Sequence, residues 1–110
     1  MILNLNKPIK DNKDKYIKCL EYDLYGLTIK DFNNIEKIYF NLMQDNSVEY
    51  LIPESQLIYK LCAFFISSCK FNKNLSFAEF LRIKGKDKRC IVKIIDNFFI
   101  PKEIISKKKD

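Results

Sequence analysis

A small α+β domain is the fold class that this sequence predicts. Its 110 residues suit one domain, and 47% of them are hydrophobic, which is enough apolar side chain for a core. Short apolar runs bounded by turn-forming residues alternate with two longer runs whose apolar residues recur at helical spacing. These runs predict the order strand, helix, two strands, helix, two strands, with both helices packed on one face of a small sheet.

The first half of the chain predicts a strand, a helix and a hairpin. The apolar residues Ile2, Leu3 and Leu5 are followed by the turn-forming residues Asn6 and Pro8, so we expect a short opening strand. Residues 14–25 predict a helix that begins at Asp14 and carries an apolar face. The apolar runs 35–43 and 47–52 predict two strands, because three turn-forming residues separate them.

The second half predicts a buried helix followed by another hairpin. Residues 55–70 form a run that is apolar nearly all round, with Ser55 as its N-cap, which indicates a helix at the centre of the domain. The segment 80–95, "FLRIKGKDKRCIVKII", alternates apolar and basic residues on both sides of Gly85. It predicts two strands with one apolar and one cationic face.

The elements together predict a globular domain over residues 1–100 and a short basic tail over 101–110. The core is expected to contain one apolar residue or more from each helix and from the last hairpin: Leu20, Leu24, Leu61, Phe65, Ile83, Val92 and Ile94.

Positive charge is concentrated in the second half. The net charge is +6, with a balance of −1 over residues 1–66 and +7 over residues 67–110. Such a field attracts polyanions, so the partner classes are nucleic acid, an anionic membrane surface or an acidic protein. Phosphate contacts are the expected role of six cations on the last hairpin, namely Arg82, Lys84, Lys86, Lys88, Arg89 and Lys93.

The residue types present favour a binding protein over an enzyme. There is no histidine, no glycine-rich phosphate loop and no pair of cysteines at CxxC spacing among the four cysteines. We therefore expect no metal, no cofactor and no small-molecule substrate. The longest apolar stretch, 57–66, contains Lys60 and is far shorter than a bilayer span, so we expect no membrane segment and a cytoplasmic protein.

Three segments carry a resemblance to a known family. "LNKPIKDNKD", "KYIKCLEYDLYGLTI" and "IPESQLIYKLCAFFISSCKFNKNLSFAEFLRIKGKDKRCIVKIID" are similar, in order and spacing, to the eukaryotic large-subunit ribosomal protein L twenty-two family over residues 2–96. The chain departs from that family in having Phe80 in place of a tryptophan, fewer lysines on the second helix and a lysine tail. It thus resembles a trimmed and diverged member.

The resemblance implies a structural constituent of the cytosolic large ribosomal subunit that binds ribosomal RNA by phosphate and shape contacts at the subunit surface, beside neighbouring ribosomal proteins. It implies RNA-facing roles for Lys60, Lys70, Lys73 and Arg82. The expected RNA-binding set is therefore these four together with the other hairpin cations: Lys84, Lys86, Lys88, Arg89 and Lys93.

A protein-interaction module is the alternative. The aromatic residues of the second helix and its end, Phe64, Phe65 and Phe71, or the tyrosines Tyr39 and Tyr50, could form an apolar docking patch. Phosphate-driven binding weakens steeply with salt and an apolar interface hardly responds, so a salt titration separates the two functions.

Overall fold

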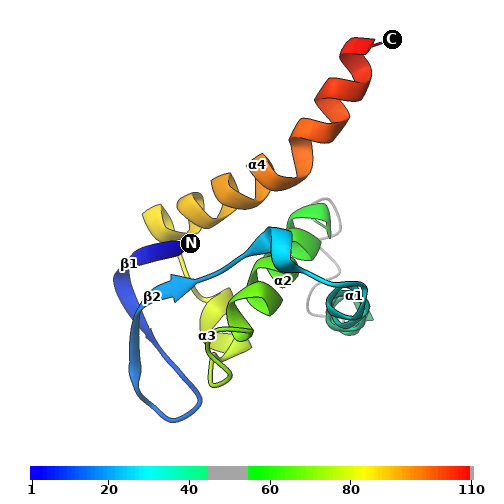
Figure 1. Ribbon diagram of the computed structural model, residues 1–110. Helices are drawn as coiled ribbons and strands as arrows, with labels where there is room; N and C mark the ends of the chain where they lie inside the picture. Colours follow the sequence, from blue (N-terminus) through cyan, green and yellow to red (C-terminus); the bar gives the residue numbers. More distant parts are fainter. Residues whose placement is uncertain (45–54, 110) are drawn as a thin grey trace.

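The computed structural model describes residues 1–44 and 55–109, with side chains for 1–44 and 56–99. The described chain is α+β, as the sequence predicts: one antiparallel two-stranded sheet and four α-helices (Figure 1). The elements in order are β1 (Ile2–Lys10), β2 (Tyr16–Glu21), the 3-10 turn η1 (Leu24–Gly26), α1 (Ile29–Gln44), α2 (Ser55–Cys69), α3 (Phe77–Leu81) and α4 (Gly85–Lys109). Both strands thus precede all the helices, and this order differs from the predicted one.

β1 and β2 form a hairpin around a turn organised by Asp11. Its carboxylate accepts the backbone N–H groups of Lys13 and Lys15 at 2.8 and 2.9 Å. Asp14, predicted to cap a helix, instead takes the left-handed conformation with φ of 61°, which Asp tolerates better than most residues. β1 continues to Lys10, beyond the predicted end of the opening strand.

The predicted helix over residues 14–25 is wrong, because this segment contains the strand β2, which pairs with β1 across a bulge. Asn4 pairs with Cys19 and Ile9 pairs with Ile17, so four residues of β1 lie opposite one residue of β2. On β2, Ile17 and Leu20 are both buried although they are three residues apart. Three-residue spacing is the helical signal that produced the prediction.

The bulge also leaves backbone donors without partners on β2, and α4 supplies an acceptor for them. Asn6 and Lys7 donate their N–H groups to the carboxylate of Asp87 at 2.9 and 3.0 Å. Asp87 is only 5% exposed. Burial by itself raises the pKa of this carboxyl, but the two backbone N–H groups, with smaller contributions from the Asn6 side chain and the charge of Lys86, more than offset it, so the pKa of Asp87 is lowered. An ionised side chain therefore joins the first turn of α4 to β1.

The predicted strand over residues 35–43 is wrong as well, because this run belongs to α1. Thr28 and Asp31 form a reciprocal capping box: Asp31 accepts the Thr28 N–H at 2.8 Å and Thr28 Oγ1 accepts the Asp31 N–H at 3.2 Å. Ile35 is fully buried and Ile38 and Leu42 pack around it at helical spacing. The partner strand predicted over 47–52 lies outside the described residues.

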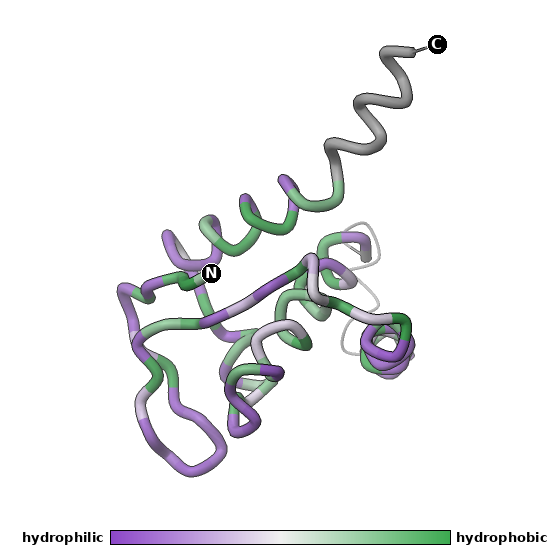
Figure 2. The backbone as a smooth tube through the Cα atoms, in the orientation of Figure 1, coloured by the Kyte–Doolittle hydropathy of each residue, from purple (hydrophilic) through white to green (hydrophobic). Residues whose placement is uncertain are grey.

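The predicted central helix is confirmed as α2. Four of its residues, Cys62, Ala63, Phe64 and Ser67, have no exposed surface. α2 contributes to both hydrophobic clusters, one shared with the hairpin and α4 and the other shared with α1. The largely apolar colouring of α2 in Figure 2 agrees with contacts on more than one side.

The predicted hairpin over residues 80–95 is wrong, because these residues form the end of α3, a short connection and the start of α4. Ser76 Oγ caps α3 by accepting the Glu79 N–H at 3.3 Å. Gly85 has φ of 64° where the chain enters α4, a conformation that favours glycine. On α4, Ile91 and Ile95 are buried one turn apart.

Most of the predicted core is confirmed. Leu20, Leu24, Phe65 and Ile83 are buried, and the others, Leu61, Val92 and Ile94, are partly buried. The predicted boundary at residue 100 lies inside α4, whose backbone is helical through Lys109 and which projects away from the other elements in Figure 1.

Candidate interaction surface

Lys60 on α2 and Lys70 just after it, which the resemblance assigns to RNA, make ion pairs within the protein. Lys70 Nζ lies 2.8 Å from Asp31 Oδ2 and donates to the Gly26 carbonyl at 3.0 Å. This contact with Lys70, with help from the cap of α1, lowers the pKa of Asp31. Lys60 Nζ lies 3.4 Å from Asp96 Oδ1 and 5.9 Å from the centroid of the Phe99 ring. These lysines join α2 to α1 and to α4.

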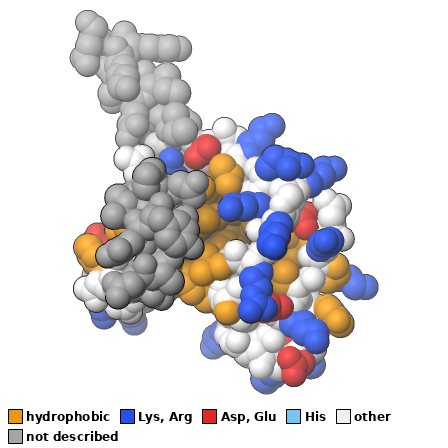
Figure 3. Space-filling view, turned by 180° about the vertical axis from the view of Figure 1, so that it is seen from behind, with side chains coloured by type: hydrophobic (Ala, Val, Ile, Leu, Met, Phe, Trp, Pro, Cys, Tyr) orange, Lys and Arg blue, Asp and Glu red, His pale blue; other side chains and the backbone are white. Residues whose placement is uncertain are grey.

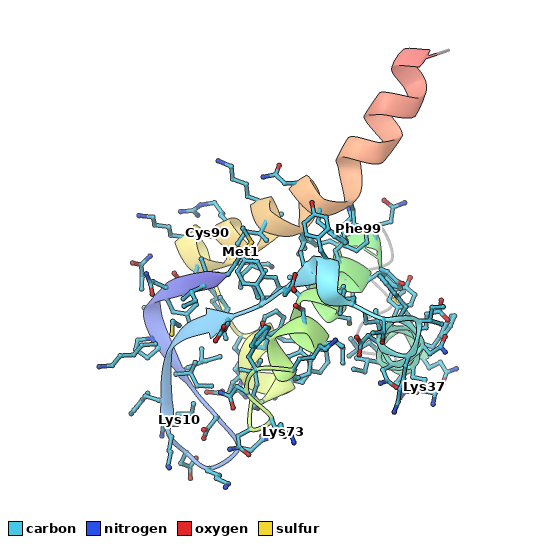
Figure 4. All side chains as sticks on the ribbon, viewed as in Figure 1. Met1, Lys10, Lys37, Lys73, Cys90 and Phe99 are labelled. Atoms are coloured by element: carbon cyan, nitrogen blue, oxygen red, sulfur yellow. The ribbon has the colours of Figure 1, made fainter. Side chains whose placement is uncertain are left out.

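The other predicted cations are exposed but do not form one cluster. Lys73 follows α2 and lies with Lys10 at the tip of the β-hairpin, at the opposite end of the molecule from Cys90 on α4 (Figure 4). Arg82 pairs with Glu79 at 3.3 Å and its side chain is 78% exposed. The predicted set therefore divides among internal ion pairs, the hairpin tip and α4.

A cationic ridge runs along the exposed side of α4. We use this name for Lys86, Arg89 and Lys93, and Lys84 and Lys88 flank the ridge. Figure 3 shows many Lys and Arg side chains on the corresponding face of the molecule. Spacings of three, four and seven residues place the ridge side chains on one helical face, a pattern that the two-residue interpretation of this segment concealed.

The described carboxylates closest to the ridge in the sequence already have partners, although Asp87 also interacts electrostatically with Lys86. Over residues 67–99 there are three carboxylates: Glu79 pairs with Arg82, Asp87 is bound to β1, and Asp96 pairs with Lys60. The described part of the chain has no ion pair that involves a ridge residue. Lys86 lies in the first turn of α4, where the helix dipole also disfavours a cation. The ridge is thus better suited to an anionic partner than to the isolated fold.

An open groove lies along one side of the ridge. Its volume is about 610 Å³, and its described lining comes from successive turns of α4: Gly85, Lys88, Arg89, Val92, Lys93, Asp96 and Asn97. Apart from Val92 these side chains are polar or charged. The groove therefore offers length and positive charge.

An apolar cleft lies on the other side of the ridge from the groove. It has a volume of about 210 Å³ and is lined by Met1, Tyr22, Leu24, Tyr25, Ile94, Asn97 and Phe98. The Tyr25 and Phe98 rings meet edge to face with centroids 4.8 Å apart, and Tyr25 is 82% exposed. Asn97 lines both the apolar cleft and the groove, so the two hollows adjoin. The sequence prediction missed this cleft because it depends on a contact between η1 and α4.

Of the aromatic residues predicted to form a docking patch, the two on α2 are buried. Phe64 and Phe65 are buried in the core, where they contact other aromatic rings. Phe71 is 49% exposed, and Tyr39 packs edge to face against Tyr59. Tyr50, the remaining residue of the predicted patch, lies outside the described residues.

Two of the cysteines, Cys62 and Cys69, are shielded from water, the first fully and the second partly. Burial raises the pKa of the Cys62 thiol to about 12 and that of Cys69 to about 11, so both are protonated at neutral pH. Within the described residues, no group of three or more cysteine or acidic side chains is placed to hold a metal ion. Over the same residues, no helix combines the length and apolar character needed to cross a bilayer.

Comparison with known proteins identifies no relative: no protein-family description, curated protein or solved structure matches this chain.

Proposed function

We propose that this chain is a small protein-interaction module whose binding surface is the exposed side of α4 together with the apolar cleft. The observation that carries the proposal is that an open apolar cleft adjoins the groove beside the cationic ridge, the two hollows sharing Asn97, while no ridge residue has an ion pair among the described residues. A surface with both features matches the mixed apolar and polar character of protein interfaces, in which arginine and aromatic residues are enriched.

The free energy of burying apolar surface supports a protein partner over a partner bound by charge alone. A partner that covers Tyr25 and Phe98 removes apolar surface from water, which contributes about 25 cal/mol per Å² of apolar area buried. If the partner is acidic, its carboxylates also relieve the repulsion among the ridge cations. Their positions then fix the orientation in which the partner binds. One protein segment can do both, because cleft and ridge lie on neighbouring parts of one helix.

RNA binding is the second candidate, and the unneutralised ridge is the observation that favours it. Lysines without carboxylate partners can contact phosphates and release counterions. A ribosomal role is a proposal that rests on the resemblance, and the element order that the resemblance predicts differs from the order in the structure. Charge therefore supports RNA binding here, whereas the apolar cleft has no evident use in phosphate contacts.

Site-specific photo-crosslinking in the native cells distinguishes these candidates. The photoreactive residue benzoylphenylalanine replaces Asn97 at the binding surface or, as a matched control, Phe40 on α1, which is 57% exposed. We expect discrete protein adducts at position 97 that survive ribonuclease and are absent from position 40. Adducts that ribonuclease removes would instead support RNA binding, and equal adducts at both positions would refute the proposed surface.

A further inference from the structure

The cleft and the ridge are aligned along α4. Asn97, at the edge of the apolar cleft, is followed towards the N-terminus of α4 by Lys93 and Arg89 at intervals of four residues. A rise of 1.5 Å per residue places Lys93 about 6 Å and Arg89 about 12 Å from Asn97 along the helix axis. An apolar site is thus followed by cations one and two turns away on the same helix face.

We propose that the occupant of this surface is an acidic amphipathic helix of a partner protein. One large apolar side chain enters the cleft, and carboxylates four and eight residues from it pair with Lys93 and Arg89. This inference rests on the proposed function and assigns the chemistry of its partner.

The size of the cleft supports a single apolar anchor. A volume of about 210 Å³ is smaller than the roughly 300–1,000 Å³ typical of pockets for drug-sized ligands. Six of the seven lining residues are apolar or aromatic, and the exposed edge of Tyr25 forms part of the rim. Side chains of this kind anchor helical peptides in grooves at spacings set by the helical turn.

The charge on the ridge determines which residues the rest of the partner helix should carry. Asp96 pairs with Lys60, so the only described carboxylate lining the groove is already neutralised. A helix packed alongside α4 presents one residue per turn to the successive positions of a four-residue row. Glutamate or aspartate at those positions meets Lys93 and Arg89, and basic residues there are repelled.

Selection from a display library of random peptides about 16 residues long, with the full chain as target, tests this proposal. We expect enriched peptides with one large apolar residue and acidic residues four and eight positions to one side of it. Synthetic fluorescent copies are then measured by anisotropy. We expect Tyr25→Ser to weaken their binding about tenfold or more, as for a central interface residue, and Phe40→Ser, an exposed aromatic change on α1, to have no effect.

Charge reversal tests the ridge separately from the cleft. The double variant Arg89→Glu, Lys93→Glu should lose the acidic peptides and gain binding of copies whose acidic residues are replaced by lysine. The control double variant Lys30→Glu, Lys37→Glu makes the same charge change at exposed residues of α1. It should change the binding of neither the acidic peptides nor their lysine copies. Circular dichroism of each variant checks that the fold is retained.

Several outcomes would overturn the inference. These are a selection that enriches no peptide, enriched peptides without the acidic spacing, or a charge reversal that leaves their binding unchanged. Displacement of the peptides by a duplex RNA would also overturn it, since the surface would then prefer phosphate. Peptides that have the anchor and lack the acidic residues would refute only this inference, whereas missing protein adducts at position 97 would refute the proposed function itself.

Discussion

Replacing Asp87 by alanine tests the contact that joins α4 to the bulge in β1. The buried carboxylate accepts the N–H groups of Asn6 and Lys7, and a hydrogen bond to a charged group contributes about 1.5–3 kcal/mol. Asn6 and Lys7 are themselves exposed, so water can reach their N–H groups in part and the low end of that range applies. We expect Asp87→Ala to lower the free energy of unfolding by about 3 kcal/mol, twice the lower bound for one such bond.

Asp96→Ala is the matched control. Its side chain is 40% exposed and makes one ion pair, with Lys60, at 3.4 Å. Exposed pairs of this kind contribute about 0–1 kcal/mol, so this variant should lose less than about 1 kcal/mol although it removes the same charge from the same helix. Urea unfolding followed by circular dichroism measures both variants.

The pH dependence gives a second and independent check on Asp87. Because the pKa of Asp87 is lowered in the folded protein, its stabilisation is fully present above the unfolded pKa of about 4 and is lost as the pH falls through the folded value. The stability difference between wild type and Asp87→Ala should therefore shrink as the pH falls below about 4. A loss below about 0.5 kcal/mol at neutral pH, the range of an ordinary surface change, or a difference independent of pH would refute the reasoning.

Two further substitutions and one labelling experiment test the interior of the protein. Ser67 Oγ accepts the Asp23 N–H at 2.7 Å, so Ser67→Ala should lower the unfolding free energy by about 1–3 kcal/mol; an unchanged urea midpoint would contradict this. The buried Ser68 hydroxyl has no hydrogen-bond partner among the described residues, so Ser68→Ala should raise that free energy by about 1 kcal/mol, and a loss of stability would show that the hydroxyl is satisfied. Cys62, whose thiol pKa is raised to about 12 by burial, should react with a thiol reagent at pH 8 far more slowly than the exposed Cys19, as followed by mass spectrometry; equal rates would contradict its burial.

Several properties of this protein follow from its sequence alone. The run 55–70 is apolar on all sides, and only a helix with neighbours on more than one side can bury such a surface, as α2 does. The opening strand was predicted at the right place, and the coarse α+β class is confirmed. The excess of positive charge in the second half is likewise a sequence property, since it depends on composition and not on contacts.

The candidate surface was only partly predictable. Arg89 and Lys93 were expected to bind a partner and do lie on an exposed face, but the sequence placed them on a strand. Residues Ile91, Ile94, Ile95 and Phe98 carry the helical spacing that identifies α4, and the short alternation before them masked it.

Only the tertiary structure decided which residues of similar type act together. Local patterns report the spacing of apolar residues along the chain, and Ile17 and Leu20 have the spacing of a helix although they lie on the extended strand β2. Likewise, lysines are equivalent in the sequence, yet Lys70 pairs with Asp31, whereas Lys93 has no ion pair among the described residues. The physical reason is that hydrogen bonds and ion pairs act over a few ångströms, so their partners are set by which distant segments the fold brings together.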